Sequence, residues 1–298
     1  MKRLVLIDGY SLLHRAYFAL PKNITTSKGD IVNAVYGFTR MLLKVIKDLK
    51  PNYIALAYDV KGPTFRDEIY EFYKEGRPEM EKELERQLPL VDEVVEAFNI
   101  SIFSKVGYEA DDVIATLVDK LKTKGEIIVV TGDIDLFQII DKNVKVYAPL
   151  KGLSDPILYG EGEVKERFGF DPHKILDYKA LQGDASDNIP GVKGIGEKTA
   201  TELLKKYKNI EDIYKNISQV DKRLVILLRE GKNTVELSRR LVELKRDVPL
   251  EVDINNLKLK LDKQKLLKFF KKLEFKSLIK KLEEEGGEAK NRGQMRLI

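Results

Sequence analysis

The chain has 298 residues, of which 43% are hydrophobic and 34% charged, with a net charge of +5 at pH 7, no cysteine and only two histidines. It is long enough for one large domain or two smaller ones, and this composition excludes disulfides and thiolate metal sites and argues against zinc. We expect a cytoplasmic protein, because no apolar run reaches the roughly 20 residues of a membrane span and the N-terminus lacks a signal-peptide pattern.

Short apolar runs alternate with helical patterns over the first half of the chain. The predicted strands are 4–7, 53–58, 100–103 and 127–130, and helical periodicity covers roughly 31–49, 79–98 and 110–123. Beyond residue 160 the pattern changes to short helices separated by Gly, Pro and Asp. We therefore predict an α/β core over 1–160 with a mainly parallel central sheet flanked by helices, a helical region over 161–282, and a flexible tail over 283–298.

Acidic residues follow the predicted strands. Asp8 and Asp59 end the first two runs, Asp133 and Asp135 come after the run 127–130, and Glu109, Asp111 and Asp112 open the helix predicted to follow the run 100–103. One aspartate after a strand is usually a turn residue or a helix cap. Ligands of open α/β sheets bind beyond the carboxyl ends of the strands, so this repetition predicts one shared site.

Six or more carboxylates in one crevice must bind cations or protonate, because two unit charges 4 Å apart repel by roughly 4 kcal/mol at an effective dielectric of 20. Oxygen ligands without His or Cys favour Mg²⁺, with Mn²⁺ as a substitute. A calcium loop of the D-x-D-x-D-G type is not present. Carboxylate-held Mg²⁺ predicts phosphoryl-transfer chemistry with two ions about 3.5–4 Å apart.

The stretch 183–200 is rich in Gly, Lys and Asp. It is not a nucleotide-binding P-loop, because Glu197 separates Gly196 from Lys198 and no strand precedes it. We predict a helical hairpin whose glycines and helix N-terminus hold a DNA phosphate with Lys193 and Lys198. A plain helix–helix turn is the structural alternative.

Basic and aromatic residues alternate between Lys61 and Arg77. This alternation suits phosphate binding with base stacking, and it equally suits a charged amphipathic helix.

These motifs together resemble the 5′-nuclease family, which includes the 5′–3′ exonuclease domain of bacterial DNA polymerase I, phage 5′-exonucleases and flap endonucleases. The resemblance rests on Asp8, Asp59, the runs Gly-Tyr-Glu-Ala-Asp-Asp at 107–112 and Thr-Gly-Asp-Ile-Asp-Leu at 131–136, and the stretch 183–200. It extends to about residue 282 and implies a free-standing exonuclease. One departure is Ile134, where the family usually has Lys, so a secondary phosphate contact is expected to be missing.

The resemblance implies roles for individual residues. One metal region would be held by Asp8, Asp59, Glu109, Asp111 and Asp112, and completed or extended by Asp133, Asp135, Asp184 and Asp187. In an arch segment over about 62–98, Arg66, Lys74 and Arg77 would grip the scissile phosphate while Tyr73 stacks on a terminal base. The hairpin, over about 183–204, would be the family's helix–three-turn–helix, which can hold a monovalent cation and would bind duplex DNA through Gly191, Val192, Lys193, Gly194, Ile195, Gly196, Lys198 and Thr199.

We therefore expect a monomeric, nucleoid-associated, structure-specific 5′ nuclease that hydrolyses DNA near 5′ ends, nicks and flap junctions in primer removal and repair. One metal ion would activate a water and the other would stabilise the leaving oxygen, with Asp8 and Asp59 among the catalytic groups and Lys74 and Arg66 offsetting phosphate charge. The alternatives are a PIN-like single-strand ribonuclease, a catalytically inactive DNA-binding module and, least favoured, a Mg²⁺-dependent phosphatase.

The last five residues, from Gln294 to Ile298, resemble the short peptides with which replication proteins dock into the sliding clamp. Frayed termini are also common, so a plain tail is the alternative.

Overall fold

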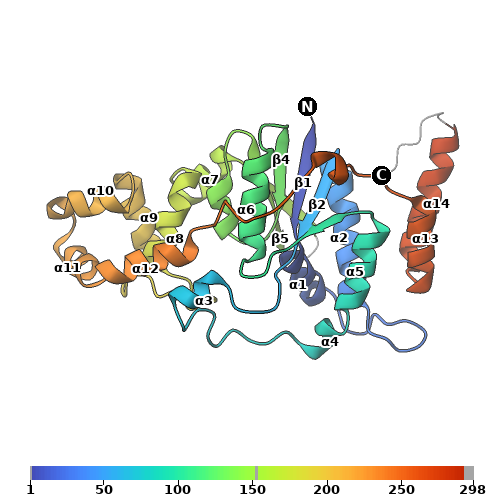
Figure 1. Ribbon diagram of the computed structural model, residues 1–298, viewed down its shortest axis with the longest axis horizontal. Coiled ribbons are helices and arrows are strands. Elements are labelled where there is room, and N and C mark those ends of the chain that lie inside the picture. Colours follow the sequence, from blue (N-terminus) through green and yellow to red (C-terminus); the bar gives the residue numbers. More distant parts are fainter. Residues whose placement is uncertain (1, 152–153, 292–298) are drawn as a thin grey trace.

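A six-stranded sheet forms the centre of the computed structural model, which describes residues 2–151 and 154–291 (Figure 1). The strand order is β3-β2-β1-β4-β5-β6. Every neighbouring pair from β3 to β5 is parallel, and β6 is antiparallel to β5. The strands are β1 (Arg3–Asp8), β2 (Tyr53–Ala57), β3 (Ser101–Phe103), β4 (Glu126–Val130), β5 (Val144–Lys151) and β6 (Ser154–Tyr159). The predicted α/β fold with a mainly parallel sheet is confirmed.

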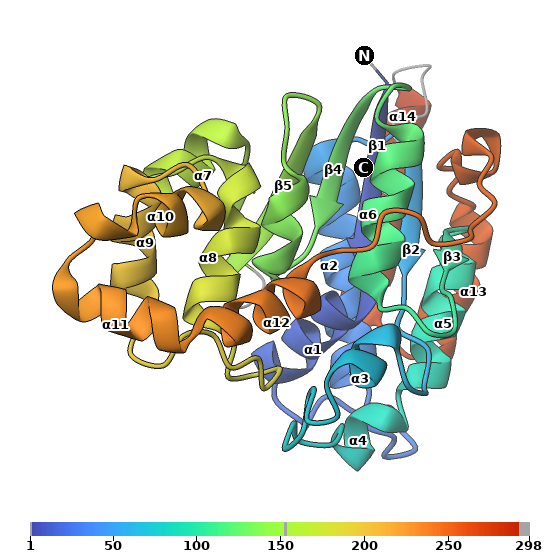
Figure 2. The same cartoon turned by 60° about the vertical axis from the view of Figure 1, so that its left-hand side comes forward.

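Helices cover both faces of the sheet, which explains why its strands read as continuous apolar runs. Leu4 and Leu6 point to the face covered by α6, whereas Val5 and Ile7 point to the face covered by α1, α2 and α5. Figure 2 shows α6 crossing in front of β1 and β2. The helices of this body are α1 (Gly9–Ala19), α2 (Asn33–Leu49), α3 (Phe65–Ile69), α4 (Lys82–Glu85), α5 (Leu88–Ala97) and α6 (Ala110–Leu121).

The described chain after β6 is helical. One group of helices lies at one end of the sheet, and the last two helices lie at the opposite end (Figure 1). The first group comprises α7 (Glu161–Phe168), α8 (Ile175–Gln182), α9 (Glu197–Lys206), α10 (Ile210–Lys215), α11 (Lys222–Glu230) and α12 (Lys232–Val242). The second comprises α13 (Lys263–Lys272) and α14 (Lys276–Asn291). Within the described residues, no helix combines the length and the apolar character that crossing a bilayer requires.

Three local features differ from the predictions. The helix predicted over 79–98 is two helices, α4 and α5, because Pro89 stands in the first turn of α5 and favours a new helix start there. The β5–β6 hairpin was not predicted. The predicted tail does not begin at 283, since α14 continues to Asn291; Glu, Lys and Ala favour helix strongly enough to carry it through Gly286 and Gly287.

The division into domains at residue 160 stays a prediction. Side chains of the body contact the chain beyond it: Arg66 Nε donates to the Leu241 carbonyl at 2.7 Å, and Gln138 Nε2 donates to the Val242 carbonyl at 3.2 Å.

Candidate active site

Three of the predicted carboxylates follow neighbouring parallel strands at one edge of the sheet. Asp8 is the last residue of β1, and Asp59 and Asp133 lie just beyond β2 and β4. Asp8 pairs in register with Ala57, and Ile7 pairs with Val130, so the three strands end level with one another. The fold therefore brings these aspartates to the same edge, next to α1 and α3 (Figure 2).

Asp8 is buried, and each of its carboxylate oxygens has one donor. Oδ1 accepts from the Ser11 backbone N–H at 3.1 Å, and Oδ2 accepts from the Thr131 hydroxyl at 2.7 Å. Burial raises the pKa of Asp8 to about 7 against these two hydrogen bonds, and the charges of Asp133 and Asp59 add to the rise. Each oxygen keeps a free lone pair, so this carboxylate is suited to a cation.

Asp111 lies among the strand-end aspartates. It stands in the first turn of α6, whose Ala110 N–H donates to Asp59 Oδ1 at 2.6 Å. Burial raises the pKa of Asp111 well above its usual range, and the charges of four other aspartates raise it further: Asp133, Asp8, Asp59 and Asp135. We call these five residues the strand-end cluster.

Asp112 has a different environment from its neighbour Asp111. Its two oxygens accept from Arg66 Nη1 at 2.7 Å and Nη2 at 2.9 Å, from the Glu109 N–H at 3.1 Å and from the Lys245 N–H at 2.8 Å. These four donors use all the lone pairs of the carboxylate. In this structure Asp112 anchors Arg66 and two backbone segments, and its role as a metal ligand stays a prediction.

Arg66 is correspondingly unavailable to a phosphate. Its side chain is 3% exposed and gives its donors to Asp112 and to the carbonyls of Leu241 and Glu243. Burial works against its charge, yet Asp112 and Glu109 outweigh it and raise the pKa of the guanidinium. Arg66 is thus engaged within the protein in this structure, and its predicted contact with the scissile phosphate stays a prediction.

Lys74 faces the carboxylates from the arch segment. Its Nζ lies 2.7 Å from Glu109 Oε1 and 3.9 Å from Asp187 Oδ2, and Arg77 Nη1 lies 3.7 Å from Asp187 Oδ1. Lys74 has a positive φ of 55°, and its N–H donates to the Asp187 carbonyl at 3.0 Å. Burial lowers the pKa of Lys74, but Glu109 and Asp187 more than reverse this, so the group stays charged.

Tyr73 does not have the exposure that stacking requires. Its ring is buried, and its hydroxyl lies 3.2 Å from Glu109 Oε2 and 3.3 Å from Asp187 Oδ2. The predicted stacking of Tyr73 on a terminal base stays a prediction, and it would require the ring to leave these contacts. We call the group Arg66, Tyr73, Lys74, Glu109 and Asp112 the arch base.

Lys179 is a member of the site that the sequence analysis missed. Its Nζ lies 3.0 Å from Asp135 Oδ1 and also donates to Asp184 Oδ2. Burial lowers the pKa of Lys179, and the two carboxylates outweigh that effect and raise it. A sequence signal existed: Lys179 is five residues before Asp184, at the end of α8, and the buried pattern of that helix includes it.

Asp135 and Asp184 respond differently to Lys179. Burial raises the pKa of Asp135 to about 7; the charge of Asp133 adds to the rise, and the charge and hydrogen bond of Lys179 oppose it. Burial also opposes ionisation of Asp184, but hydrogen bonds from Lys179 and Ser186 lower its pKa below the usual range. Ile134, between the two predicted ligands, packs its side chain partly into the core.

The carboxylates are not gathered into a ready-made chelate. Within residues 2–151 and 154–291, no three acidic or histidine side chains meet in an arrangement that could hold one metal ion. Lys74 and Lys179 each hold carboxylates of the neighbourhood in ion pairs.

The predicted hairpin turns between α8 and α9. Gly191 has φ 59°, and a Cβ there would lie 2.4 Å from the Gly183 nitrogen, so this glycine serves close packing of the chain on itself. Its own N–H donates to the Ser238 hydroxyl at 3.0 Å. Val192 and Ile195 are buried in the core. Gly191, Val192 and Ile195 thus have packing roles in this structure, and their predicted DNA contacts stay a prediction.

The remaining predicted DNA-binding residues of the hairpin are at least partly exposed to solvent. Lys193, Gly194, Gly196 and Lys198 are exposed, and Thr199 is partly exposed in the first turn of α9. These five residues keep the surface that a phosphate contact needs.

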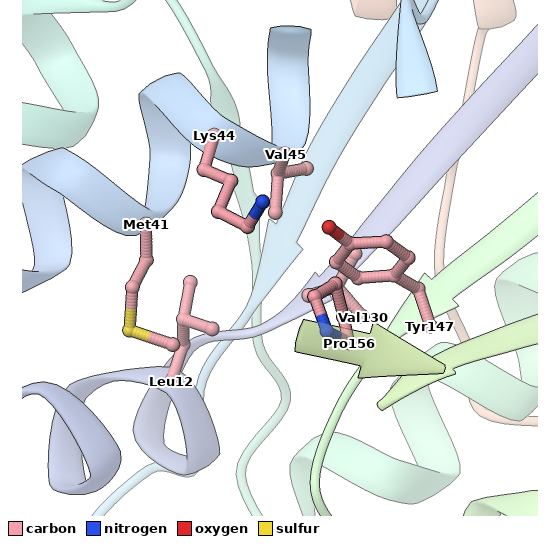
Figure 3. Close-up of a pocket in the computed structure, with 7 residues that line it drawn as sticks. All are labelled: Leu12, Met41, Lys44, Val45, Val130, Tyr147 and Pro156. Carbon is pink, nitrogen blue, oxygen red and sulfur yellow. The ribbon is translucent and has the colours of Figure 1, made fainter. Parts of the chain in front are cut away.

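A separate apolar pocket lies between α1, α2 and the β5–β6 end of the sheet (Figure 3). Its polar atoms are already engaged, because Tyr147 donates to Asp48 Oδ2 at 2.7 Å and Lys44 Nζ lies 2.8 Å from the same carboxylate. None of its lining residues is acidic, so the pocket adds no carboxylate to the strand-end cluster. The lining residues are Leu12, Met41, Lys44, Val45, Val130, Tyr147 and Pro156.

Two family models match the chain in succession. Residues 3–169 match the model described as "5'-3' exonuclease, N-terminal resolvase-like domain", and residues 170–265 match "5'-3' exonuclease, C-terminal SAM fold".

Two relatives illustrate the sequence similarity. The chain is 44% identical to DNA polymerase I of Caldicellulosiruptor bescii over 284 residues, which cover 94% of the chain and 33% of that protein. It is 40% identical to the 5'-3' exonuclease of Aquifex aeolicus over 285 residues, which cover 95% of the chain and 96% of that protein. The chain thus spans about a third of the polymerases that it matches and nearly all of the exonuclease.

Solved structures share the fold. The 5'-exonuclease of bacteriophage T5 with bound zinc matches with a TM-score of 0.67 and 21% identity, over 82% of this chain and 90% of that chain. The catalytic core of Rad2 with a DNA substrate matches with a TM-score of 0.59 and 17% identity, over 91% of this chain and 87% of that chain.

Proposed function

The chain belongs to the 5′-3′ exonuclease family, and from this premise we propose that it hydrolyses DNA phosphodiesters near 5′ ends, nicks and 5′-flap junctions with the help of divalent metal ions. The observation that carries the proposal is the strand-end cluster. Five aspartates meet at the carboxyl edge of a parallel sheet, and burial with mutual repulsion raises the pKa of Asp8 and Asp135 to about 7.

The donor set fits hard divalent cations. Its members carry only carboxylate oxygens, and neither His14 nor His173 belongs to it. We propose that two Mg²⁺ ions, or Mn²⁺ ions in their place, are held by carboxylates of this site. The proposed ligands are Asp8, Asp59, Glu109, Asp111, Asp133, Asp135, Asp184 and Asp187. When bound, such ions supply charge neutralisation and an activated water.

The chain's own cations complete the proposed chemistry. Lys74 stays charged and lies between Glu109 and Asp187 at the side of the site formed by the arch segment. The ammonium of Lys74 would offset the charge on the oxygens of the scissile phosphate. Arg66 would act indirectly. Its ion pair with Asp112 fixes the start of α6, and this in turn positions Glu109 and Asp111.

The exposed hairpin residues are proposed to hold the duplex. Lys193 and Lys198 flank Gly194 and Gly196, and α9 begins at Glu197 with free backbone N–H groups. Such a contact reads the phosphate backbone and not the base sequence. We also propose that this turn holds a monovalent cation.

The deciding experiment incubates the pure protein with a labelled 5′-flap duplex, with Mg²⁺ and with EDTA. We expect 5′ products only with Mg²⁺, and none from an Asp111→Asn variant. Binding without cleavage by the wild type in Mg²⁺ would instead identify an inactive DNA-binding module. Both family matches are to 5′-3′ exonuclease domains, so the PIN-like ribonuclease and the phosphatase are set aside.

We further propose a monomeric, cytoplasmic, nucleoid-associated protein that works in primer removal and repair.

Docking to the sliding clamp through Gln294–Ile298 concerns residues outside the described part of the chain. A docked tail would raise the local enzyme concentration to roughly millimolar. A peptide spanning 288–298 should bind the clamp of the same organism, and a Gln294→Ala, Leu297→Ala peptide should not; equal binding or none at about 1 mM would contradict docking.

A further inference from the structure

The chain between α12 and α13 is largely irregular, and it lies against α6. Figure 2 shows it leaving α12, crossing in front of α6 and continuing toward α13. We call residues 243–258 the strap. The strap is held to the core by its apolar side chains. Those that are buried or packed against the core are Leu244, Val248, Leu250, Val252, Ile254 and Leu257.

Three side chains on one face of α6 bond to the backbone of the strap. They stand four residues apart, at positions 112, 116 and 120, and residues with this spacing share a helix face. In the first turn of α6, Asp112 Oδ1 accepts from the Lys245 N–H at 2.8 Å. In the last turn, Lys120 Nζ donates to the Leu250 carbonyl at 2.7 Å. The strap therefore follows α6 along its length.

Thr116 provides the contact between these two, in the interior of the protein. Its side chain is buried, and its Oγ1 accepts from the Val248 N–H at 3.2 Å and lies 3.5 Å from the Lys245 carbonyl oxygen. Val248 is buried as well, so its N–H would lose its partner without gaining water if the hydroxyl were removed. The Thr116 hydroxyl therefore fixes the strap to the middle of α6.

The strap and the sheet hold α6 in different ways. Val113, Leu117 and Leu121 of α6 pack into the same core cluster as Leu4 and Leu6 of β1. Such apolar contacts are non-directional, whereas a hydrogen bond weakens steeply when its length or angle changes. The three contacts with the strap therefore add a directional constraint on the position of α6 along its axis.

The axial position of α6 matters because Glu109 caps this helix and Asp111 stands in its first turn. We propose, resting on the proposed nuclease function, that the strap sets this position and that Thr116 is a positioning residue for these two proposed metal ligands. The hydroxyl of Thr116 bonds to backbone groups of the strap, and Thr116 lies more than one helical turn beyond Asp111. Thr116 thus acts on the carboxylates through the helix.

The test removes the hydroxyl while keeping the shape of the side chain. Thr116→Val lacks the acceptor for the Val248 N–H, and Thr116→Ser keeps it. Thr39→Val is the matched control, because Thr39 is equally buried and its hydroxyl donates to the Val35 carbonyl at 2.7 Å within α2, on the other face of the sheet.

Two measurements are made on each protein. The first is the Mn²⁺ affinity of the DNA-free protein, from the electron paramagnetic resonance signal of the free ion. The second is the Mg²⁺ concentration that half-saturates single-turnover cleavage of a 5′-flap duplex, together with the rate at saturating Mg²⁺. Melting temperatures show how much stability each substitution costs.

We expect Thr116→Val to weaken Mn²⁺ binding and to raise the half-saturating Mg²⁺ concentration by about tenfold, the lower end of the effect of residues that orient metal ligands. The rate at saturating Mg²⁺ should stay within about threefold of the wild type, since the ligands themselves are unchanged. Thr116→Ser and Thr39→Val should match the wild type in both measurements. A loss of stability alone would leave the metal affinity of the folded protein unchanged.

Lys120→Met tests the same strap from the exposed end of α6, and it keeps the proposal testable if Thr116→Val does not fold. It removes the donor to the Leu250 carbonyl. Because Lys120 lies farther from Asp111 than Thr116 does, we expect a smaller weakening of Mn²⁺ binding in the same direction. Unchanged Mn²⁺ affinity in every folded strap variant would overturn the proposal.

Other results would also overturn it: no Mn²⁺ binding by the wild type, an equal weakening in Thr39→Val, or a failure of Thr116→Ser to restore the affinity. Failure of the nuclease function is read separately, from the absence of Mg²⁺-dependent cleavage by the wild type. A Thr116-dependent Mn²⁺ affinity in a protein that does not cleave DNA would keep the positioning role and reject the nuclease.

Discussion

The strand-end cluster and the arch base lie next to each other but differ in how the charges of their carboxylates are balanced. In the strand-end cluster, burial and repulsion raise the pKa of Asp8, Asp111 and Asp135. In the arch base, Glu109 and Asp112 are met by Lys74 and Arg66. The boundary falls between consecutive residues, Asp111 and Asp112. The comparison teaches that a carboxylate surrounded by other carboxylates, such as Asp111, favours an outside cation, whereas one whose lone pairs are all used by protein donors, such as Asp112, holds the protein together.

The largest expected effect separates catalysis from binding in the strand-end cluster. Asp111→Asn and Asp135→Asn should each abolish cleavage of a 5′-flap duplex in Mg²⁺, because each removes a proposed ligand. Affinity for the same DNA should stay within about tenfold, or 1.4 kcal/mol, since phosphates bind elsewhere. Single-turnover kinetics and a binding titration measure the two effects. Wild-type turnover in either variant would contradict the ligand assignment.

Substitutions in the arch base should change the stability of the folded protein. Asp112→Asn should lower the free energy of unfolding by about 3–5 kcal/mol, because it leaves the buried Arg66 charge without its partner. Replacing both residues with Arg66→Met and Asp112→Leu should cost less than Asp112→Asn alone. Urea unfolding of the three proteins provides the measurement. An Asp112→Asn protein as stable as the wild type would mean that the pair does not anchor α6.

Lys74 tests whether the arch base also takes part in catalysis. Lys74→Ala should slow single-turnover cleavage by about two orders of magnitude, or about 3 kcal/mol of transition-state stabilisation. Lys198→Ala, the matched change in the hairpin, should mainly weaken duplex binding and reduce the salt slope by about one unit. If both variants showed the same pattern, the arch segment and the hairpin would not have separate roles.

The smallest expected effect is a pH dependence of stability. The folded pKa of Asp8 and Asp135, about 7, exceeds the unfolded value, so the folded state binds more protons between about pH 4 and 7. The metal-free protein should therefore lose stability as pH rises through this window, by several degrees of melting temperature. Saturating Mg²⁺ should remove most of the slope. Thermal melts with EDTA and with Mg²⁺ would check this, and a slope of the opposite sign would exclude the cluster as its source.

The sheet and the strand-end aspartates could be predicted from the sequence because both depend on local patterns. Apolar runs such as 127–130 specify buried parallel strands, and the rule that sites lie beyond strand ends places Asp8, Asp59 and Asp133 together. The β5–β6 hairpin was not predicted because Pro149 and Pro156, which pair across it, are typical of breaks in a strand.

The partners of the acidic residues could not be predicted. Asp111 and Asp112 have the same chemistry in the sequence, and only the direction of each side chain from α6 decides that one meets aspartates and the other meets Arg66. Lys179 was missed because the five-residue spacing to Asp184 does not by itself indicate an ion pair, and its other partner, Asp135, comes from a distant part of the chain. Such pairings depend on tertiary contacts, which the residue pattern does not encode locally.

The Arg66–Asp112 pair also bears on the order in which the protein is made. Its remaining donors and acceptors belong to Leu241, Glu243 and Lys245, which leave the ribosome more than a hundred residues after Asp112. The central strands are complete by residue 159, long before then. Since domains fold as units during synthesis, a nascent chain would hold an assembled sheet with an unfinished start of α6. The start of α6 would acquire its final geometry only after residue 245 has been synthesised.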